Sequence, residues 1–127
     1  MHEIDAGEME GVEGEERIDE YQDVLYSMMR GEPGAGFPGG DSRESVLART
    51  RPVLEGLAGA HGDRDVALVS HGGACRFMAT AAAGIDPDWA IAHRLPNCTF
   101  IVLEPRGKPF GSWQMTRWDT EERKLGE

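Results

Sequence analysis

One apolar run, ended by a serine, a histidine and two glycines, constrains this chain more than any other segment. Val66 to Val69 has the length and composition of a buried parallel strand, and Ser-His-Gly-Gly follows it at residues 70–73. A helix-like stretch from Ala74 to Ala83 comes next. His71 would therefore stand where open α/β sheets bind their ligands, with glycines that allow close approach and helix N–H groups that favour an anion. The segment predicts a phosphate-sized anion held against an imidazole.

Apolar residues at helical spacing predict two longer helices elsewhere in the chain. The first runs from about residue 17 to residue 30 and stops at Gly31. The second begins at Asp41, which we expect to cap the helix together with Glu44, and continues through Leu57.

The pattern of the remaining segments predicts loops and short elements. Residues 31–40 form a glycine-rich loop in which Phe37 is the one large apolar anchor. Residues 89–93 form a short helical piece, Thr99 to Leu103 a second strand, and residues 112–118 its hairpin partner. The elements together predict an α/β fold.

Four short motifs point to one family. Val-Ser-His-Gly-Gly at residues 69–73 is similar to the second-histidine motif of the histidine phosphatase superfamily, which includes the cofactor-dependent phosphoglycerate mutases. Residues 1–11 resemble the family pattern Leu-x-Glu-x-x-x-Gly-x-Trp-Glu-Gly, with Met1 for the Leu and Met9 for the Trp. Gly-Gly-Asp-Ser at residues 39–42 is similar to Gly-Gly-Glu-Ser, and Asn-Cys-Thr at 97–99 to an Asn-x-Ser/Thr segment that opens a later strand. The four occur in family order across residues 1 to about 118.

The family's nucleophile motif, Arg-His-Gly, has no counterpart in this sequence. None of the four histidines, His2, His61, His71 and His93, follows an arginine. The resemblance therefore implies that residues 1–127 are the C-terminal portion of a single histidine phosphatase domain, a three-layer α/β fold that is N-terminally truncated. We expect residues 119–127 to form a frayed tail.

The resemblance also implies roles for four residues. His71 is the second imidazole, which donates hydrogen bonds to the phosphoryl group, and Glu3 is the acid that protonates the leaving alcohol. Gly72 supplies a backbone N–H to the phosphate, and Asn97 orients the phosphate or a pocket loop. No metal and no other cofactor is implied.

Several residues keep a second interpretation. Glu3 is one of 23 acidic residues, and without its motif it would be a solvated carboxylate. A shift of the assignment by a few residues would pass the acid role to Glu8 or Glu10. Arg76 either supports the site or pairs with an acid on its own helix, and we favour the pairing. We expect the other histidines to lie on the surface, and both cysteines, Cys75 and Cys98, to be small buried residues.

The implied activity is hydrolysis of a small phosphomonoester, or phosphate transfer, through a phosphohistidine. The short span between Gly11 and Gly39 favours a phosphatase over a mutase, and the substrate itself is left open. The alternative is a non-catalytic module that binds a phospho-ligand or a partner, which the missing nucleophile favours. A serine hydrolase is excluded because Ser70 and His71 are adjacent and would point to opposite faces of a strand.

Charge and composition limit the partners. The net charge of −10 argues against nucleic acid and anionic membranes, and the acidic N-terminus has no hydrophobic signal region, so the expected compartment is the cytoplasm. In the family, the Arg-His-Gly strand lies between the strand that ends at His71 and the strand at residues 100–103. Without it we expect unpaired strand edges, low stability and self-association.

Overall fold

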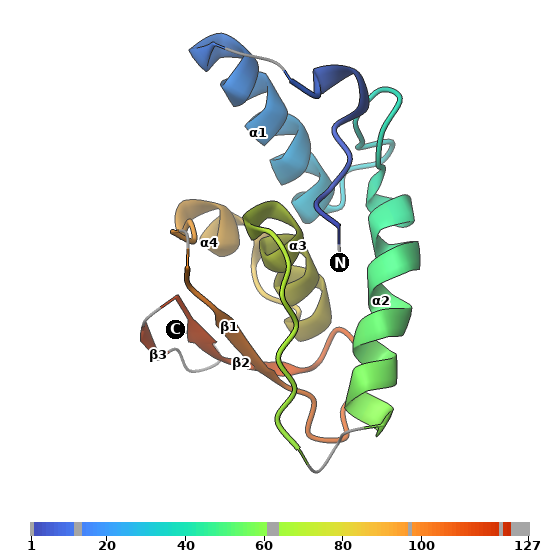
Figure 1. The fold of residues 1–127 in the computed structure, drawn as a ribbon, viewed down its shortest axis with the longest axis vertical. Helices are drawn as coiled ribbons and strands as arrows, with labels where there is room; N and C mark the ends of the chain where they lie inside the picture. The colour runs from blue at the N-terminus through green and yellow to red at the C-terminus, as the bar shows by residue number, and fades with distance from the viewer. Residues whose placement is uncertain (1, 12–13, 61–63, 97, 120, 123–127) are drawn as a thin grey trace.

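The chain folds as a small mixed α/β domain in a computed structural model that describes residues 2–11, 14–60, 64–96, 98–119 and 121–122 (Figure 1). Helix α3 lies at the centre, with α1, α2 and α4 around it and a small antiparallel sheet beside it. Within these ranges no helix is long and apolar enough to cross a membrane. The elements are η1 (Gly7–Met9), α1 (Glu15–Arg30), α2 (Arg43–Ala60), α3 (Gly72–Ala83), α4 (Pro87–Ala92), β1 (Ile101–Glu104), β2 (Gln114–Trp118) and β3 (Glu121–Glu122).

The sheet is a meander in the order β1-β2-β3, and all pairs among the described residues are antiparallel. The predicted hairpin is confirmed, with Ile101 opposite Trp118 and Glu104 opposite Gln114. Trp118 is buried, and its indole N–H donates to the carbonyl of His93 at 2.8 Å, which joins the sheet to the end of α4. Most of the expected tail at 119–127 lies outside the described residues.

The predicted C-terminal ends of α1 and α3 are confirmed, and each helix is followed by a glycine. Gly31 follows α1 with φ 75° and donates its N–H to the carbonyl of Met28, and Gly84 follows α3 with φ 60° and donates to Thr80. A residue without a Cβ adopts this left-handed conformation at little cost. Half of the eight buried residues of α3 are alanines, which lets the neighbouring helices approach closely.

The predicted capping pair of α2, Asp41 with Glu44, was wrong. The helix begins after Ser42, and Ser42 and Ser45 form the cap: each backbone N–H donates to the other's hydroxyl, at 2.9 and 3.1 Å. Asp41 instead accepts from the backbone N–H of Asp5 and from Arg49, both at 2.8 Å. A reciprocal Ser–Ser pair satisfies the helix N–H groups locally, so the Asp41 carboxylate is free to hold the N-terminal segment.

The predicted strand at Val66 to Val69 was also wrong. These residues form no strand, although Figure 1 shows them running as a long extended segment past α3. Val66 and Leu68 are exposed, and Val69 is 85% exposed. An apolar run becomes a buried strand only where neighbouring strands supply its hydrogen bonds and its cover, and the described residues supply neither.

We expect the exposed side chains of this segment to drive self-association. Replacing Val69 with aspartate should shift the chain toward monomer in analytical ultracentrifugation, because a charge on an unpaired apolar edge opposes pairing between chains. Ile18→Asp, at an exposed apolar position of α1, is the matched control and should change the distribution little. A wild-type chain that stays monomeric at high concentration would contradict the prediction.

The Gly-Gly-Asp-Ser motif is explained by a close backbone crossing. A Cβ at Gly40 would lie 2.4 Å from the carbonyl oxygen of Asp5 and 2.6 Å from the nitrogen of Gly7. We therefore expect Gly40→Ala to lower the free energy of unfolding by about 1–3 kcal/mol, measured by urea denaturation. Gly56→Ala is the control: nothing lies within 4 Å of its Cβ position, and removing a helical glycine should stabilise the chain by about 0.5–1 kcal/mol. Equal effects of the two variants would show that the crossing does not constrain the fold.

Candidate active site

The candidate site is built at the amino end of α3. His71 is the residue before the helix, in an extended conformation with φ −117° and ψ 159°, and its side chain makes no capping hydrogen bond. The imidazole is exposed. The structure thus presents an accessible imidazole beside the first N–H groups of a 12-residue helix, where the helix dipole favours a negative group.

Glu3 reaches the same helix end from the other end of the chain. Its Oε1 accepts from the backbone N–H of Ala74 at 2.7 Å and of Ile4 at 2.9 Å, and its Oε2 accepts from Gly73 at 3.2 Å. Glu3 and Ala74 are 71 residues apart in sequence. A Cβ at Gly73 would lie 3.0 Å from Oε1, so this glycine makes room for the carboxylate. The motif at residues 1–11 and the motif at residues 69–73 therefore meet at one point.

Arg49 of α2 holds the backbone of the N-terminal segment in place. Its guanidinium donates to the carbonyl oxygens of His2 at 3.2 Å and Glu3 at 3.1 Å, and it pairs with Asp41. Burial alone would raise the pKa of the Asp41 carboxyl, but the hydrogen bonds from Arg49, the Asp5 N–H and Ser45 together hold that pKa below its ordinary value. The position of Glu3 thus depends on the salt bridge between Asp41, in the Gly-Gly-Asp-Ser motif, and Arg49 of α2.

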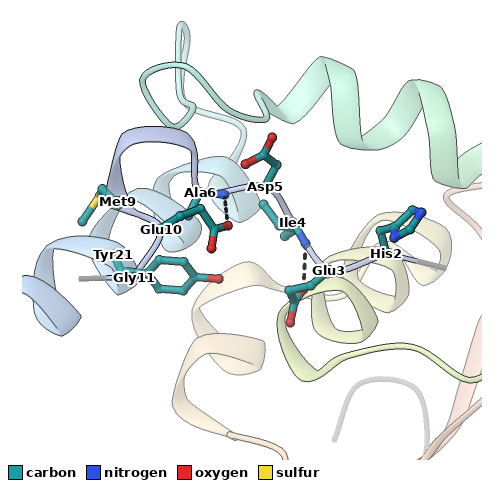
Figure 2. Close-up of a pocket in the computed structure, with 9 residues that line it drawn as sticks. All are labelled: His2, Glu3, Ile4, Asp5, Ala6, Met9, Glu10, Gly11 and Tyr21. Atoms are coloured by element: carbon teal, nitrogen blue, oxygen red, sulfur yellow. Dashed lines mark hydrogen bonds between the residues drawn. The ribbon is translucent and has the colours of Figure 1, made fainter. Parts of the chain in front are cut away.

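A hollow of about 580 Å³ opens beside Glu3 (Figure 2). The Tyr21 ring borders it, with its hydroxyl pointing toward Glu3. Burial, together with the charges of Glu3 and Glu10, raises the pKa of Tyr21, so its hydroxyl stays a hydrogen-bond donor at neutral pH. The lining residues are His2, Glu3, Ile4, Asp5, Ala6, Met9, Glu10, Gly11 and Tyr21.

The two other candidates for the acid role, Glu8 and Glu10, make no hydrogen bond to α3 within the described part of the chain. Glu8 is exposed on η1, and no hydrogen bond to its side chain is found among the described residues. Glu10 lines the hollow, but its Oε1 accepts from the backbone N–H of Ala6 at 3.0 Å, within its own loop. Only Glu3, of these three, contacts the helix that follows His71.

Arg76 does not pair with an acid of its helix, as the sequence had suggested. It is 8% exposed, and its guanidinium carbon lies 5.6 Å from the centre of the Tyr26 ring. Within the part of the chain that the structure describes, its Nη1 has no hydrogen-bond partner. It lines a second hollow of about 200 Å³ together with Gln22, Gly72, Gly73, Arg94 and Leu95. Sequence reasoning missed Arg94, which is distinguished only by standing just before the Leu-Pro-Asn segment.

The other predicted residues are placed as follows. Asn97 and His61 lie outside the described residues. His2 is exposed, but His93 is half-buried: its ring stacks on Trp89, with centroids 4.1 Å apart, and its Nδ1 lies 2.7 Å from the Trp89 carbonyl. Both cysteines are free, and Cys98 is exposed rather than buried. Burial and the nearby Glu3 raise the pKa of the half-buried Cys75 thiol.

Comparison with known proteins assigns the chain to a family. The sequence profile of the histidine phosphatase superfamily (branch 1) matches residues 1–121. The chain is similar to phosphoserine phosphatase 1 of Hydrogenobacter thermophilus, with 32% identity over 101 residues that cover 80% of this chain and 48% of that protein. The chain thus spans about half the length of this curated relative, and no solved structure matches it. With nearly its whole length matched by the family profile, the chain belongs to branch 1 of the histidine phosphatase superfamily.

Proposed function

We propose that this chain carries the acid and the second histidine of a phosphomonoesterase site, and that the phosphohistidine forms on a histidine outside these 127 residues. One observation supports this most strongly: the Glu3 carboxylate meets the helix that begins directly after His71. The two residues of the proposed chemistry thus stand at the same helix end. The substrate is a small phosphomonoester, and phosphoserine is the first candidate because of the similar phosphatase.

The proposed reaction has two steps. In the first, the external imidazole attacks phosphorus, a P–N bond forms, the ester P–O bond breaks, and Glu3 gives a proton to the leaving alkoxide. In the second, water attacks the phosphohistidine, Glu3 takes a proton from that water, and the P–N bond breaks. His71 and the N–H of Gly72 donate hydrogen bonds to the phosphoryl oxygens throughout.

The hydrogen bonds of Glu3 suggest which oxygen handles the proton. Oε1 accepts two N–H bonds at 2.7 and 2.9 Å, whereas Oε2 accepts one at 3.2 Å. A carboxyl oxygen that carries a proton is a donor and accepts N–H bonds less well. We therefore assign the proton to Oε2, with Oε1 keeping the carboxyl group on the helix.

The finer fold is part of the same proposal. A three-layer domain needs a sheet with helices on both faces, and the exposed segment at Val66 to Val69 is the natural place for further strands to pair. We propose that the 127 residues form the C-terminal part of such a domain. Asn97 keeps its proposed role at the phosphate.

A second candidate function is a non-catalytic phospho-ligand or partner module. It is favoured by the absence of an Arg-His-Gly sequence from the chain. Such a module would use the same His71 and Gly72 to bind phosphate and would need no proton donor, so Glu3 would serve only to hold the helix end.

The test begins with the chain as it is. We expect no turnover of p-nitrophenyl phosphate at mildly acid or neutral pH. The reason is that the chain lacks the Arg-His-Gly motif, whose histidine would accept the phosphoryl group. Inorganic phosphate should shift the NMR signal of the Gly72 N–H in the wild type and much less in His71→Ala. Turnover that is lost in His71→Ala would show that His71 is itself the nucleophile. No phosphate-dependent shift at Gly72 would contradict phosphate binding in either candidate function.

A further inference from the structure

The second hollow holds two arginines and no acid. Its volume is about 200 Å³, and Arg76 of α3 and Arg94 from the segment after α4 both line it. Arg94 donates to the side-chain oxygen of Gln22, which is neutral and leaves the guanidinium charge uncompensated. Among the described residues neither arginine forms a salt bridge. In a chain with 23 acidic residues, this is a local site of positive charge.

Arg76 carries the stronger evidence for a ligand. It is more than nine-tenths buried, and its Nη1 has no hydrogen-bond partner among the described residues. A buried donor without an acceptor costs free energy, and an anion bound in the adjoining hollow would supply the acceptor. Long helical side chains point back toward the helix start. The guanidinium of Arg76 is thus carried toward Gly72 and Gly73, which line the same hollow.

The helix end adds a second kind of donor. The N–H of Gly72, in the first turn of α3, has no acceptor within the described ranges, while those of Gly73 and Ala74 donate to Glu3. Guanidinium groups and helix N–H groups both prefer an anion, and the planar guanidinium matches a planar carboxylate with two parallel hydrogen bonds. The hollow is therefore suited to a carboxylate.

We propose that Arg76 and Arg94 bind the carboxylate of the same substrate molecule whose phosphoryl group lies at His71. This inference rests on the proposed function and narrows it to phosphomonoesters that also carry a carboxylate. The shared residue is Gly72, which follows His71 directly and lines the hollow, so both anionic groups lie next to one helix end. A compact substrate with two neighbouring anionic groups spans the two places.

The experiment compares two ligands that share a phosphoryl group and differ in the carboxylate: O-phosphoserine and O-phosphoethanolamine. Each is titrated into the 127-residue chain, and the NMR signals of the Gly72 N–H and of the arginine Nε–H groups give the affinity and the contact. We expect phosphoserine to bind about tenfold more tightly, the size of one charge-assisted contact, and to move the Arg76 and Arg94 signals. Phosphoethanolamine should move the Gly72 signal alone.

Two variants decide between this site and others. Arg94→Gln should weaken phosphoserine binding until its affinity equals that of phosphoethanolamine. Because Arg94 is exposed, the variant should remain folded. Arg76→Lys should reduce the preference in part, because a lysine keeps the charge but lacks the paired donors. Arg106→Gln is the control, since Arg106 is exposed in the turn after β1 and pairs with Glu104. It should keep the tenfold preference.

Each other outcome has a defined meaning. Equal affinities in the wild type, with a Gly72 shift that depends on His71, would overturn the carboxylate site and leave the proposed function standing. A preference for phosphoserine that survives in Arg94→Gln would overturn it as well, because the carboxylate would then be bound elsewhere. No binding of either ligand would overturn both proposals.

Discussion

Replacing Glu3 with glutamine should slow hydrolysis of an alkyl phosphate by roughly 10²–10⁴-fold in a polypeptide or complex that joins this chain to a nucleophilic histidine. The reason is that an alkoxide is a poor leaving group and needs the proton that Glu3 provides. Glutamine keeps the shape of the side chain and one acceptor oxygen for the helix N–H groups. The loss should therefore be one of proton transfer, and p-nitrophenyl phosphate, whose leaving group needs no proton, should be affected little.

The measurement is kcat/KM for phosphoserine and for p-nitrophenyl phosphate in the wild type and in Glu3→Gln. Glu8→Gln is the matched control, because Glu8 is exposed on η1 in the same segment and should leave both rates unchanged. A thermal denaturation curve of each variant separates a loss of fold from a loss of chemistry. Equal losses for the two substrates would remove Glu3 from the acid role and leave it as a residue that holds α3.

Replacing His71 with alanine should lower turnover by about 10²–10³-fold in the same complete enzyme. This imidazole is proposed to stabilise charge on the phosphoryl oxygens, which develops whatever the leaving group is. The loss should therefore be similar for phosphoserine and p-nitrophenyl phosphate, in contrast to that of Glu3→Gln. Because the His71 side chain is exposed and makes no capping hydrogen bond, its removal should cost little stability.

His93→Gln serves as the control histidine. His93 packs on Trp89 in α4, so its replacement should lower stability but leave the rate of the folded enzyme close to wild type. A loss for His71→Ala that is confined to the alkyl substrate would make His71 the proton donor and overturn the assignment of Glu3. An unchanged rate would place His71 outside the site.

The pattern of the sequence alone was enough to locate the main helices and the hairpin. Helices α1 and α3 end at Gly31 and Gly84 because a left-handed residue stops a helix locally, whatever packs around it. The hairpin of β1 and β2 is likewise a local element, whose alternation and turn residues stand together in the chain. The motif around His71 also pointed to the family, which the match over residues 1–121 shows.

Tertiary structure decided the features that depend on distant partners. The apolar run at Val66 to Val69 has the composition of a strand but pairs with no other described segment, because pairing depends on neighbouring segments and not on the run itself. Asp41 is of a residue type that often caps helices. Here Ser42 and Ser45 cap α2, and the Asp41 carboxylate instead binds Arg49, which holds the N-terminal segment.

The same distinction holds at the candidate site. Sequence motifs named Glu3 and His71 separately, but only the fold brings the Glu3 carboxylate to the N–H groups of Gly73 and Ala74. Arg94 belongs to no motif, and Arg76 could equally have been a surface ion pair. What marks them is burial, a missing hydrogen-bond partner and a shared hollow, and these properties exist only once the chain has folded.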